Sequence, residues 1–418
     1  MKINKCLVGW FVGVALCVAL VSAQEDGGET RPEGRETGDR GRGFFNFILD
    51  PLKSTIRSAK NLIGNPVNRA SDGVDMVRLQ TYKMFMSLYN KTYSPDEIPR
   101  RMALFFERRK QIEESVKMFQ EGKSLFVMRE NDFTDWDEDE LKKLTGVSLP
   151  DTSELEPEEL NVEPVVESSN SIDDHNADKE SSLVVGADSV PATMDWRESG
   201  CVSTPINQLK CGACYAIATM SVVESMRCLN QVTSPTLSPQ QIVDCATSRA
   251  GYANYGCDGG WPTRVFKYLQ DVGVASRETC YPFVRRQNTC KLRQMKETSG
   301  CTVAASPTNS RLQYKILNNE RDIQYHVANT GPVVTVMKAS DKFLYYGKGI
   351  FDDPRCSRRR DDVDHAIVIV GYGRESGVDY WIIKNSWGTT SWGEGGYGKF
   401  RRGKFACSIG HWGWVVTS

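Results

Sequence analysis

The chain has 418 residues, 40% of them hydrophobic, and carries a net charge of −1 at pH 7. This length allows two or three domains, and this apolar fraction excludes a chain that is disordered throughout. The charge is uneven, because residues 191–418 hold 28 basic and 19 acidic side chains, which leaves 24 (52 − 28) and 34 (53 − 19) for the remainder. The two parts would attract each other, although a chance asymmetry explains the counts equally well.

Residues 1–23 are typical of a cleaved secretory signal. Two lysines precede an apolar run from Leu7 to Val21, and small residues follow that suit a signal peptidase. The run is shorter than the ~20 residues of a membrane span, so we expect no transmembrane anchor after cleavage. The N-terminal extension, residues 24–75, is predicted to be mostly disordered; its amphipathic part, 44–62, suits either a surface-binding helix or a weakly packed arm.

Residues 76–148 are predicted to be helical, because apolar side chains recur there at intervals of three and four. Asn90 begins an Asn-Lys-Thr glycosylation acceptor, which indicates exposure. Residues 149–190 differ, since twelve acidic side chains face a single lysine and no periodicity remains. This composition predicts an acidic flexible linker that contains the maturation site.

Residues 191–418 are rich in Cys, Trp and Gly. A helical apolar pattern follows Cys214, whereas strand-like runs occupy 332–336, 365–370 and 380–383. A helix-rich half followed by a strand-rich half predicts an α+β domain with two lobes.

Cys214 is the candidate nucleophile of this domain. Its expected place at a helix start favours a thiolate, and a neighbouring imidazolium, with His365 as the candidate, would favour it further. Asn385 could orient the His365 ring, while Trp387 shields their hydrogen bond. Gln208 and the Cys214 backbone N–H could stabilise an oxyanion.

The same cysteine belongs to a C-x-x-C run, Cys211 to Cys214, which also suits a redox pair or half a zinc site. Neither a βαβ context nor a second Cys/His pair is apparent, so we expect no metal and no cofactor. Eleven of the 13 cysteines remain after signal removal, and five disulfides would leave one free thiol, for which Cys214 is the candidate.

Residues 191–418 closely resemble the papain-like, cathepsin-like cysteine peptidases. The motif Cys-Gly-Ala-Cys-Tyr at 211–215 matches their signature, and further matches lie at 195–197, 237–245, 256–260 and 388–398. The resemblance implies a helical left lobe and a β-barrel-like right lobe. It also implies that Cys214 is the nucleophile, His365 the general acid/base, Asn385 its orienter and Gln208 an oxyanion donor.

Substrate-binding residues follow from the same resemblance. The expected set is Gly259, Gly260, Trp261, Pro262, Val336, Asp364, Ala366, Trp387 and Trp412. The two glycines would pair with substrate backbone, whereas Trp412 would make the specificity pocket shallow; core packing is the competing role for the pocket residues. The resemblance implies disulfides Cys211–Cys257, Cys245–Cys290 and Cys356–Cys407, with Cys280–Cys301 also able to pair and Cys201–Cys228 left over.

Residues 76–148 are similar to the inhibitory propeptide of this family. The matching positions are Glu97, Arg101, Phe105, Ile112, Asn131, Phe133 and Asp135. Arg108, Val116 and Arg129 depart from its motifs and put the strength of inhibition in question. Acidification could protonate propeptide carboxylates and weaken their pairing with a basic enzyme.

The peptidase domain departs from the family at Leu209-Lys210, at Tyr215 and in a charged insertion at 357–362, which would be either a primed-side specificity loop or a solvated loop. We expect a monomeric endopeptidase zymogen of the lysosome or extracellular space, with protein substrates, its own propeptide and cystatin-type inhibitors as partners, and no nucleic acid. A low-activity binding protein of peptidase fold and a dipeptidyl aminopeptidase are the alternatives.

Overall fold

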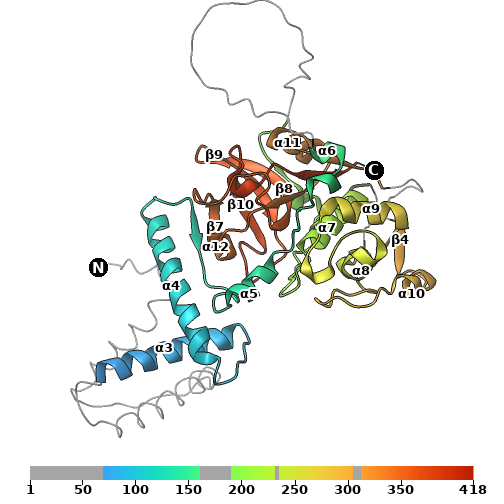
Figure 1. The fold of residues 1–418 in the computed structure, drawn as a ribbon. Helices are drawn as coiled ribbons and strands as arrows, with labels where there is room; N and C mark the ends of the chain where they lie inside the picture. Colours follow the sequence, from blue (N-terminus) through green and yellow to red (C-terminus); the bar gives the residue numbers. More distant parts are fainter. Residues whose placement is uncertain (1–68, 161–189, 231–234, 305–311, 418) are drawn as a thin grey trace, which may run out of the picture. The chain divides into compact units, whose positions relative to one another are not determined.

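The computed structural model describes residues 69–160, 190–230, 235–304 and 312–417 (Figure 1). Residues from Met76 onward form one compact unit. The predicted signal (1–23), most of the predicted N-terminal extension and most of the acidic linker lie outside the described residues. In the described part of the chain, no helix is both long and apolar enough to span a membrane.

Two long helices, α3 (Arg69–Leu88) and α4 (Ile98–Gln120), form the first part of the segment predicted to be a propeptide, and α3 begins ahead of its predicted start at residue 76. They pack through buried aromatic rings, with Tyr82, Phe85 and Phe105 at the centre. The rest of the predicted propeptide has shorter elements: β1 (Phe126–Met128), α5 (Glu138–Leu141) and a 3-10 turn at Lys142–Leu144. The predicted linker begins with a 3-10 turn at Thr152–Glu154 and α6 (Pro157–Leu160). Asp137 and Glu140 cap α5 reciprocally, which explains why so short a helix forms.

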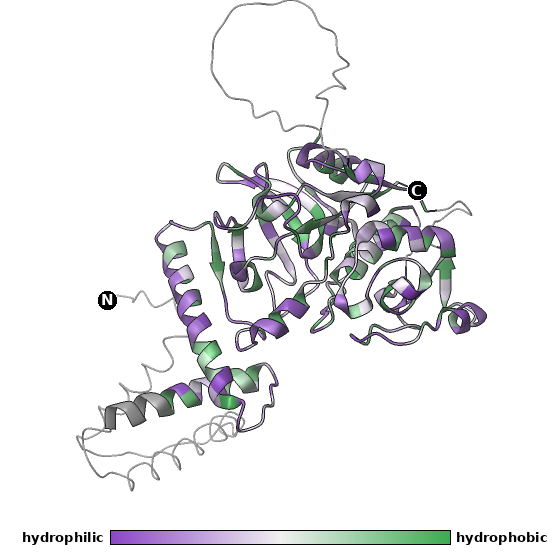
Figure 2. Ribbon diagram, viewed as in Figure 1, coloured by the Kyte–Doolittle hydropathy of each residue, from purple (hydrophilic) through white to green (hydrophobic). Residues whose placement is uncertain are grey.

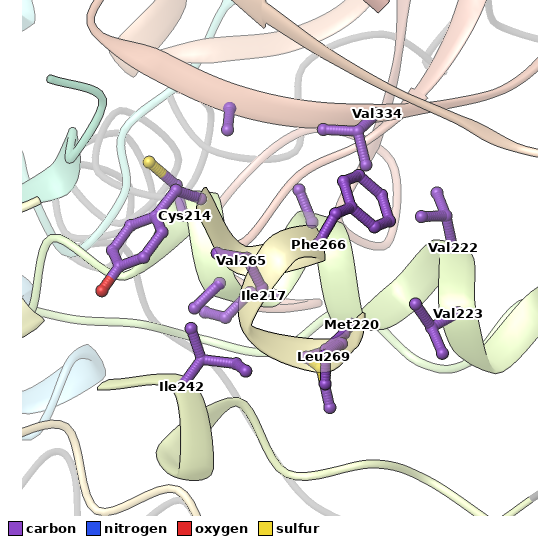
Figure 3. Packing of buried hydrophobic residues seen from close by; sticks show 14 of the residues in the cluster. Cys214, Ile217, Met220, Val222, Val223, Ile242, Val265, Phe266, Leu269 and Val334 are labelled. Atoms are coloured by element: carbon purple, nitrogen blue, oxygen red, sulfur yellow. The ribbon is translucent and has the colours of Figure 1, made fainter. Parts of the chain in front are cut away.

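The helical lobe surrounds α7 (Cys214–Asn230), which is buried from Cys214 to Arg227. Its other elements are α8 (Pro239–Cys245), α9 (Pro262–Val272), α10 (Leu292–Glu297), the hairpin β3 (Val274–Ser276) with β4 (Thr302–Ala304), and 3-10 turns at Trp196–Ser199, Ser248–Ala250 and Gly256–Asp258. Proline at the start and left-handed Gly273 at the end delimit α9. Figure 3 shows α7 side chains packed against Phe266 and Leu269, with the Cys214 sulfur directed away from Ile242.

The strand lobe is one sheet with the order β1-β7-β10-β9-β8-β6-β11-β5, and β2 pairs with β8. Its strands are β2 (Met194–Asp195), β5 (Tyr314–Leu317), β6 (Val333–Met337), β7 (Tyr346–Phe351), β8 (His365–Glu375), β9 (Val378–Lys384), β10 (Tyr397–Arg401) and β11 (Gly413–Val416). Helices α11 (Glu320–Asn329) and α12 (Asp341–Leu344) and a 3-10 turn at Ala406–Ser408 complete it. The β-branched strand β6 is buried at every position, as are the first nine residues of β8.

The propeptide contributes a strand to this sheet, because β1 pairs antiparallel with β7. Gly349 in β7 permits the contact, since a Cβ there would lie 2.3 Å from the Leu125 carbonyl oxygen. In Figure 2 the strands around β8 are largely hydrophobic, whereas much of α4 is hydrophilic. Figure 1 shows α5 near the junction of the two lobes, where the candidate site lies.

Candidate active site

Cys214 is the first residue of α7 and has no exposed surface. The start of a helix favours negative charge on the sulfur. The backbone of Ala366 in β8 lies close to that sulfur and acts to lower the pKa of the thiol. The thiol therefore lies where the helical lobe meets the first residues of β8, next to His365.

The His365 ring is held on two sides. Its Nε2 lies 2.8 Å from Asn385 Oδ1, and the Trp387 ring stacks on it with 4.7 Å between centroids. Ser386 N–H also donates to Asn385 Oδ1, which identifies that atom as an acceptor and His365 Nε2 as the donor. Within the described chain, His365 Nδ1 is buried without a hydrogen-bond partner, so it remains available to the thiol.

Burial keeps both groups uncharged in the precursor. It raises the pKa of the Cys214 thiol to about 12 and lowers the pKa of the His365 imidazole to about 4, although the Asn385 hydrogen bond raises the latter. The charged thiolate–imidazolium pair expected from the sequence is therefore disfavoured while the propeptide covers the site. The physical cause is the loss of water around both groups.

Gln208 is buried and already donates to a carbonyl of the propeptide. Its Nε2 lies 3.0 Å from the Leu144 oxygen, which also accepts a hydrogen bond of 2.9 Å from Trp387 Nε1. The Gln208 oxygen accepts from the Ser386 hydroxyl, which fixes the orientation of the amide. The propeptide thus places a peptide carbonyl against the donor that the sequence assigns to an oxyanion.

Residues 144–148, here called the crossing segment, run between the two lobes. The N–H groups of Gly146 and Val147 donate to the Asp364 carbonyl at 3.0 and 2.9 Å. On the other side, Gly260 N–H donates to the Gly146 carbonyl at 3.0 Å, and Ser148 N–H donates to the Gly260 carbonyl at 3.1 Å. The crossing segment therefore uses the backbone groups that were expected to hold substrate.

Glycines make this close passage possible. A Cβ on Gly146 would lie 2.1 Å from the Gly212 carbonyl oxygen, and one on Gly259 would lie 2.8 Å from Ser148 Oγ. Gly259 also has φ +117°, which favours glycine. Gly146 and Gly259 therefore allow the crossing segment to approach the backbone of the peptidase domain directly.

The residues expected to form the specificity pocket come together and are buried. Val336 and Ala366 are paired across β6 and β8, and Trp261 packs edge-on against Trp412 with centroids 5.3 Å apart. Pro262 begins α9 beside Trp261. The charged insertion reaches this group, because the Arg360 guanidinium lies 3.5 Å from the centroid of the Trp412 ring. The insertion thus extends the wall that contains Trp412.

The second propeptide motif is buried against the strand lobe. Asn131 Nδ2 donates to the Leu344 carbonyl at 2.8 Å, and Phe133 packs edge-on against Trp387 at 5.9 Å. Asp135 instead supports the propeptide, since it forms an ion pair of 2.6 Å with Lys91. Of the three, Asn131 and Phe133 connect the propeptide to the peptidase.

Glu97 and Arg101 of the first motif support a charged contact with the peptidase. Arg101 pairs with Glu97 at 3.5 Å and forms two hydrogen bonds with Glu140, which also pairs with Lys210 at 2.7 Å. Burial would raise the pKa of Glu140, but the hydrogen bonds from Arg101 and Lys210 lower it to about 2. Glu140 therefore stays ionised in mildly acidic compartments, and the acidification hypothesis does not hold for this carboxylate.

The other residues of interest in the propeptide also form contacts. Phe105 belongs to the α3–α4 aromatic group, and Ile112 packs into the hydrophobic core of the strand lobe. The departures Arg108 and Arg129 donate to the carbonyls of Thr134 and Thr390. The glycosylation candidate Asn90 is exposed.

The structure contains the disulfides Cys201–Cys228, Cys211–Cys257, Cys245–Cys290, Cys280–Cys301 and Cys356–Cys407. These are the pairs implied by the resemblance together with the pair left over. Among the described residues Cys214 is the free cysteine. The thiol needed for nucleophilic chemistry is therefore not consumed by a bridge, and Cys211 is not its redox partner.

Sequence reasoning missed part of the propeptide. Residues 149–160 were assigned to the flexible linker, yet α6 lies within them and Glu159 is buried at 1% exposure. Leu144 and Gly146, which touch the site itself, also carried no recognised signal. The run of acidic residues concealed the docking of residues 149–160, because composition cannot distinguish a docked acidic segment from a solvated one.

Comparisons with known proteins agree with this arrangement. Residues 190–415 match the family model described as papain family cysteine protease, and residues 82–141 match the cathepsin propeptide inhibitor domain. Ananain of Ananas comosus is 36% identical, and the match covers 74% of this chain and 78% of ananain. Pro-cathepsin H of Bos taurus is 30% identical, and the match covers 83% of this chain and 93% of the relative.

Solved precursor structures are also similar. Digestive procathepsin L2 proteinase of Tenebrio molitor superposes with a TM-score of 0.65 at 29% identity, covering 82% of this chain and all of that one. The recombinant stem bromelain precursor superposes with a TM-score of 0.61 at 28% identity, and the match covers 81% of this chain and 98% of that one. The predicted α+β papain-like fold with a helical propeptide is confirmed. The chain belongs to the papain family of cysteine proteases and is a precursor that carries a cathepsin-type inhibitory propeptide.

Proposed function

We propose that the mature protein is an endopeptidase in which Cys214 is the nucleophile, His365 the general acid/base, Asn385 its orienter and Gln208 an oxyanion donor. The observation that carries this assignment is the position of the crossing segment. A peptide carbonyl, that of Leu144, already accepts from Gln208 beside the buried thiol and its imidazole.

The reaction follows from these positions. Cys214 gives its thiol proton to His365 Nδ1, and the sulfur attacks the scissile carbonyl carbon as the C=O double bond opens to an oxyanion that Gln208 stabilises. His365 gives its proton to the leaving nitrogen as the C–N bond breaks, which leaves a thioester. Water then attacks the thioester while His365 takes its proton, and the C–S bond breaks to release the acid and restore the thiol–imidazole pair.

Endopeptidase activity is supported by the continuous path of the propeptide. The chain enters beside Trp387, crosses at Gly146 and continues past Gly260 toward α9, so a polypeptide can extend on both sides of Cys214. An aminopeptidase instead needs a group that captures a free amine. The similarity to pro-cathepsin H keeps a dipeptidyl or other aminopeptidase as the second candidate.

We place the protein in the secretory pathway, with the lysosome or the extracellular space as its destination. The signal-like residues 1–23 and the five disulfides support this, because such bonds persist in oxidising compartments. We expect maturation to create a new N-terminus between about Gly186 and Thr193. N-terminal sequencing of the acid-activated protein measures that position.

The decisive experiment compares acid-activated wild type with Cys214→Ala processed by a separate protease, using matched peptides with free and acetylated N-termini. The proposal requires cleavage of internal bonds in acetylated peptides by wild type and none by the variant. Equal rates for both proteins would refute the mechanism. Cleavage restricted to free N-termini would favour the aminopeptidase. Absence of turnover, together with failure of an epoxide to label Cys214, would favour a binding protein.

A further inference from the structure

Glu159 of α6 ends in a preformed site on the peptidase. Its Oε1 accepts hydrogen bonds from Trp261 Nε1 at 2.8 Å and Thr263 Oγ1 at 2.5 Å. Glu159 is 1% exposed, and Trp261 and Thr263 are equally enclosed, at 1% and 3%. A carboxylate is therefore buried against two neutral donors that both belong to the peptidase domain.

The peptidase alone fixes these donors. Trp261 is packed edge-on by Trp412 and Trp414, each with centroids 5.3 Å away. Trp414 Nε1 donates to Thr263 Oγ1 at 2.8 Å, so the Thr263 hydroxyl proton is directed to the carboxylate. Both donors lie at the start of the 11-residue helix α9, whose partial positive charge favours an anion. The site therefore persists when the propeptide leaves.

Basic groups of the peptidase surround the site. Arg264 pairs with propeptide Glu154 at 2.8 Å, Lys267 pairs with propeptide Glu156, and Arg360 donates to the Glu159 carbonyl at 2.6 Å. Removal of the propeptide takes away these acidic partners and leaves the cations. The local field then favours an incoming anion.

The site also adjoins the backbone expected to hold substrate. Gly260, which pairs with the crossing segment, directly precedes Trp261 in the chain. A peptide paired with Gly260 therefore lies beside the residue whose indole N–H binds the Glu159 carboxylate. In the precursor, the crossing segment pairs with the Gly260 backbone and α6 fills the carboxylate site with Glu159. In a substrate, one residue or two neighbouring residues could occupy both of these places.

We propose that the start of α9, vacated by Glu159 on maturation, is a carboxylate-binding subsite that selects an acidic side chain in the part of the substrate N-terminal to the scissile bond. This assignment rests on the proposed peptidase function. Thr263 is a specificity-determining residue in it, and Glu159 acts in the precursor as a mimic of the acidic side chain.

The test uses the mature enzyme and acetylated fluorogenic peptides that differ only by Glu or Gln at each of the three residues before the cleaved bond. We expect Glu to be preferred over Gln by roughly tenfold in kcat/KM at one position, as for a hydrogen bond to a charged group. Thr263→Val should bring this ratio close to one, whereas Thr263→Ser, which keeps the hydroxyl, should retain it. Equal kcat/KM for Glu and Gln at all three positions, or an unchanged ratio in Thr263→Val, would overturn the proposal.

A binding measurement separates this idea from the peptidase proposal and does not need Thr263 variants to fold. A peptide of residues 142–160 is titrated into mature protein carrying Cys214→Ala. Glu159→Gln in the peptide should weaken binding roughly tenfold, whereas Glu158→Gln, at an exposed neighbour, should not. Equal weakening by both changes, or by neither, contradicts the subsite. A Glu159-specific loss in a protein without turnover would uphold the subsite and reject the peptidase.

Discussion

Gly146→Ala tests whether the crossing segment is what closes the active site. The added Cβ would lie 2.1 Å from the Gly212 oxygen and 2.4 Å from its carbonyl carbon. These atoms are backbone, and Gly212 is tied in place by a hydrogen bond from its N–H to the Cys257 carbonyl and by the adjacent disulfide Cys211–Cys257. The propeptide must therefore move away, because the enzyme backbone cannot.

The magnitude follows from the hydrogen bonds that the movement breaks. Four backbone bonds hold Gly146, Val147 and Ser148 to Asp364 and Gly260. At about 0.5–1.5 kcal/mol each, the loss of two or three costs about 2–3 kcal/mol. The fraction of precursor with an uncovered site should then rise roughly 30- to 150-fold.

The assay is the rate at which an epoxide electrophile labels Cys214 in the full precursor at neutral pH. The thiol has no exposed surface, so labelling reports uncovering of the site. Lys143→Ala, at an exposed position three residues away, is the matched control and should label at the wild-type rate. Labelling of Gly146→Ala within twofold of wild type would show that the crossing segment does not limit access.

Three further predictions concern charge, orientation and packing. Glu140→Gln should speed epoxide labelling of Cys214 in the precursor about tenfold, and by the same factor at pH 7 and at pH 5. The pKa of Glu140 is lowered to about 2, so its ion pairs stabilise the precursor above the ordinary carboxyl pKa and are lost only as the pH falls toward 2. A factor that vanished at pH 5 would identify Glu140 as an acid trigger after all. In the mature enzyme, Asn385→Ala should lower kcat roughly tenfold to hundredfold. It should also move the alkaline limb of the pH–rate profile to lower pH, because the hydrogen bond to Asn385 raises the pKa of His365. An alkaline limb at the wild-type pH would contradict the orienting role. Tyr215→Phe should reduce the free energy of unfolding by about 1–2 kcal/mol, measured by urea denaturation, because the Gly256 carbonyl loses a buried hydrogen bond of 3.0 Å; no change would mean that this carbonyl finds another donor.

Much of the site could be predicted from local sequence. Cys214 begins a strongly apolar helical pattern and His365 begins a β-branched run, so the elements that carry them were evident from periodicity. The roles proposed for Asn385 and Gln208 rest on their amide chemistry and chiefly on the resemblance, because an amide has no local signature. Asn385 contacts His365, which lies 20 positions away in the chain. Gln208 contacts Ser386, which lies 178 positions away.

The state of the site could not be predicted in the same way. Sequence suggested a charged thiolate–imidazolium pair, whereas burial under the propeptide disfavours charge on both groups. It also suggested that acid weakens the propeptide, which does not hold for Glu140 between its two basic groups, whereas burial raises the pKa of Asp132 beside Ser391. Desolvation and ion pairing depend on neighbours distant in the chain, so composition does not reveal them.

The sequence by itself determined the reaction class, the division into a helix-rich and a strand-rich half, and the cysteine left over by pairing, because these depend on residue types and their spacing. Only the tertiary structure decided what covers Cys214 and what fills the start of α9. Residues 149–160 look solvated in the sequence, yet Glu159 is buried because Trp261 and Thr263, over a hundred residues away, supply its two donors. Burying a carboxylate costs free energy because it loses its water, and this cost is offset only where hydrogen-bond donors surround it. The tertiary fold alone brings such donors together.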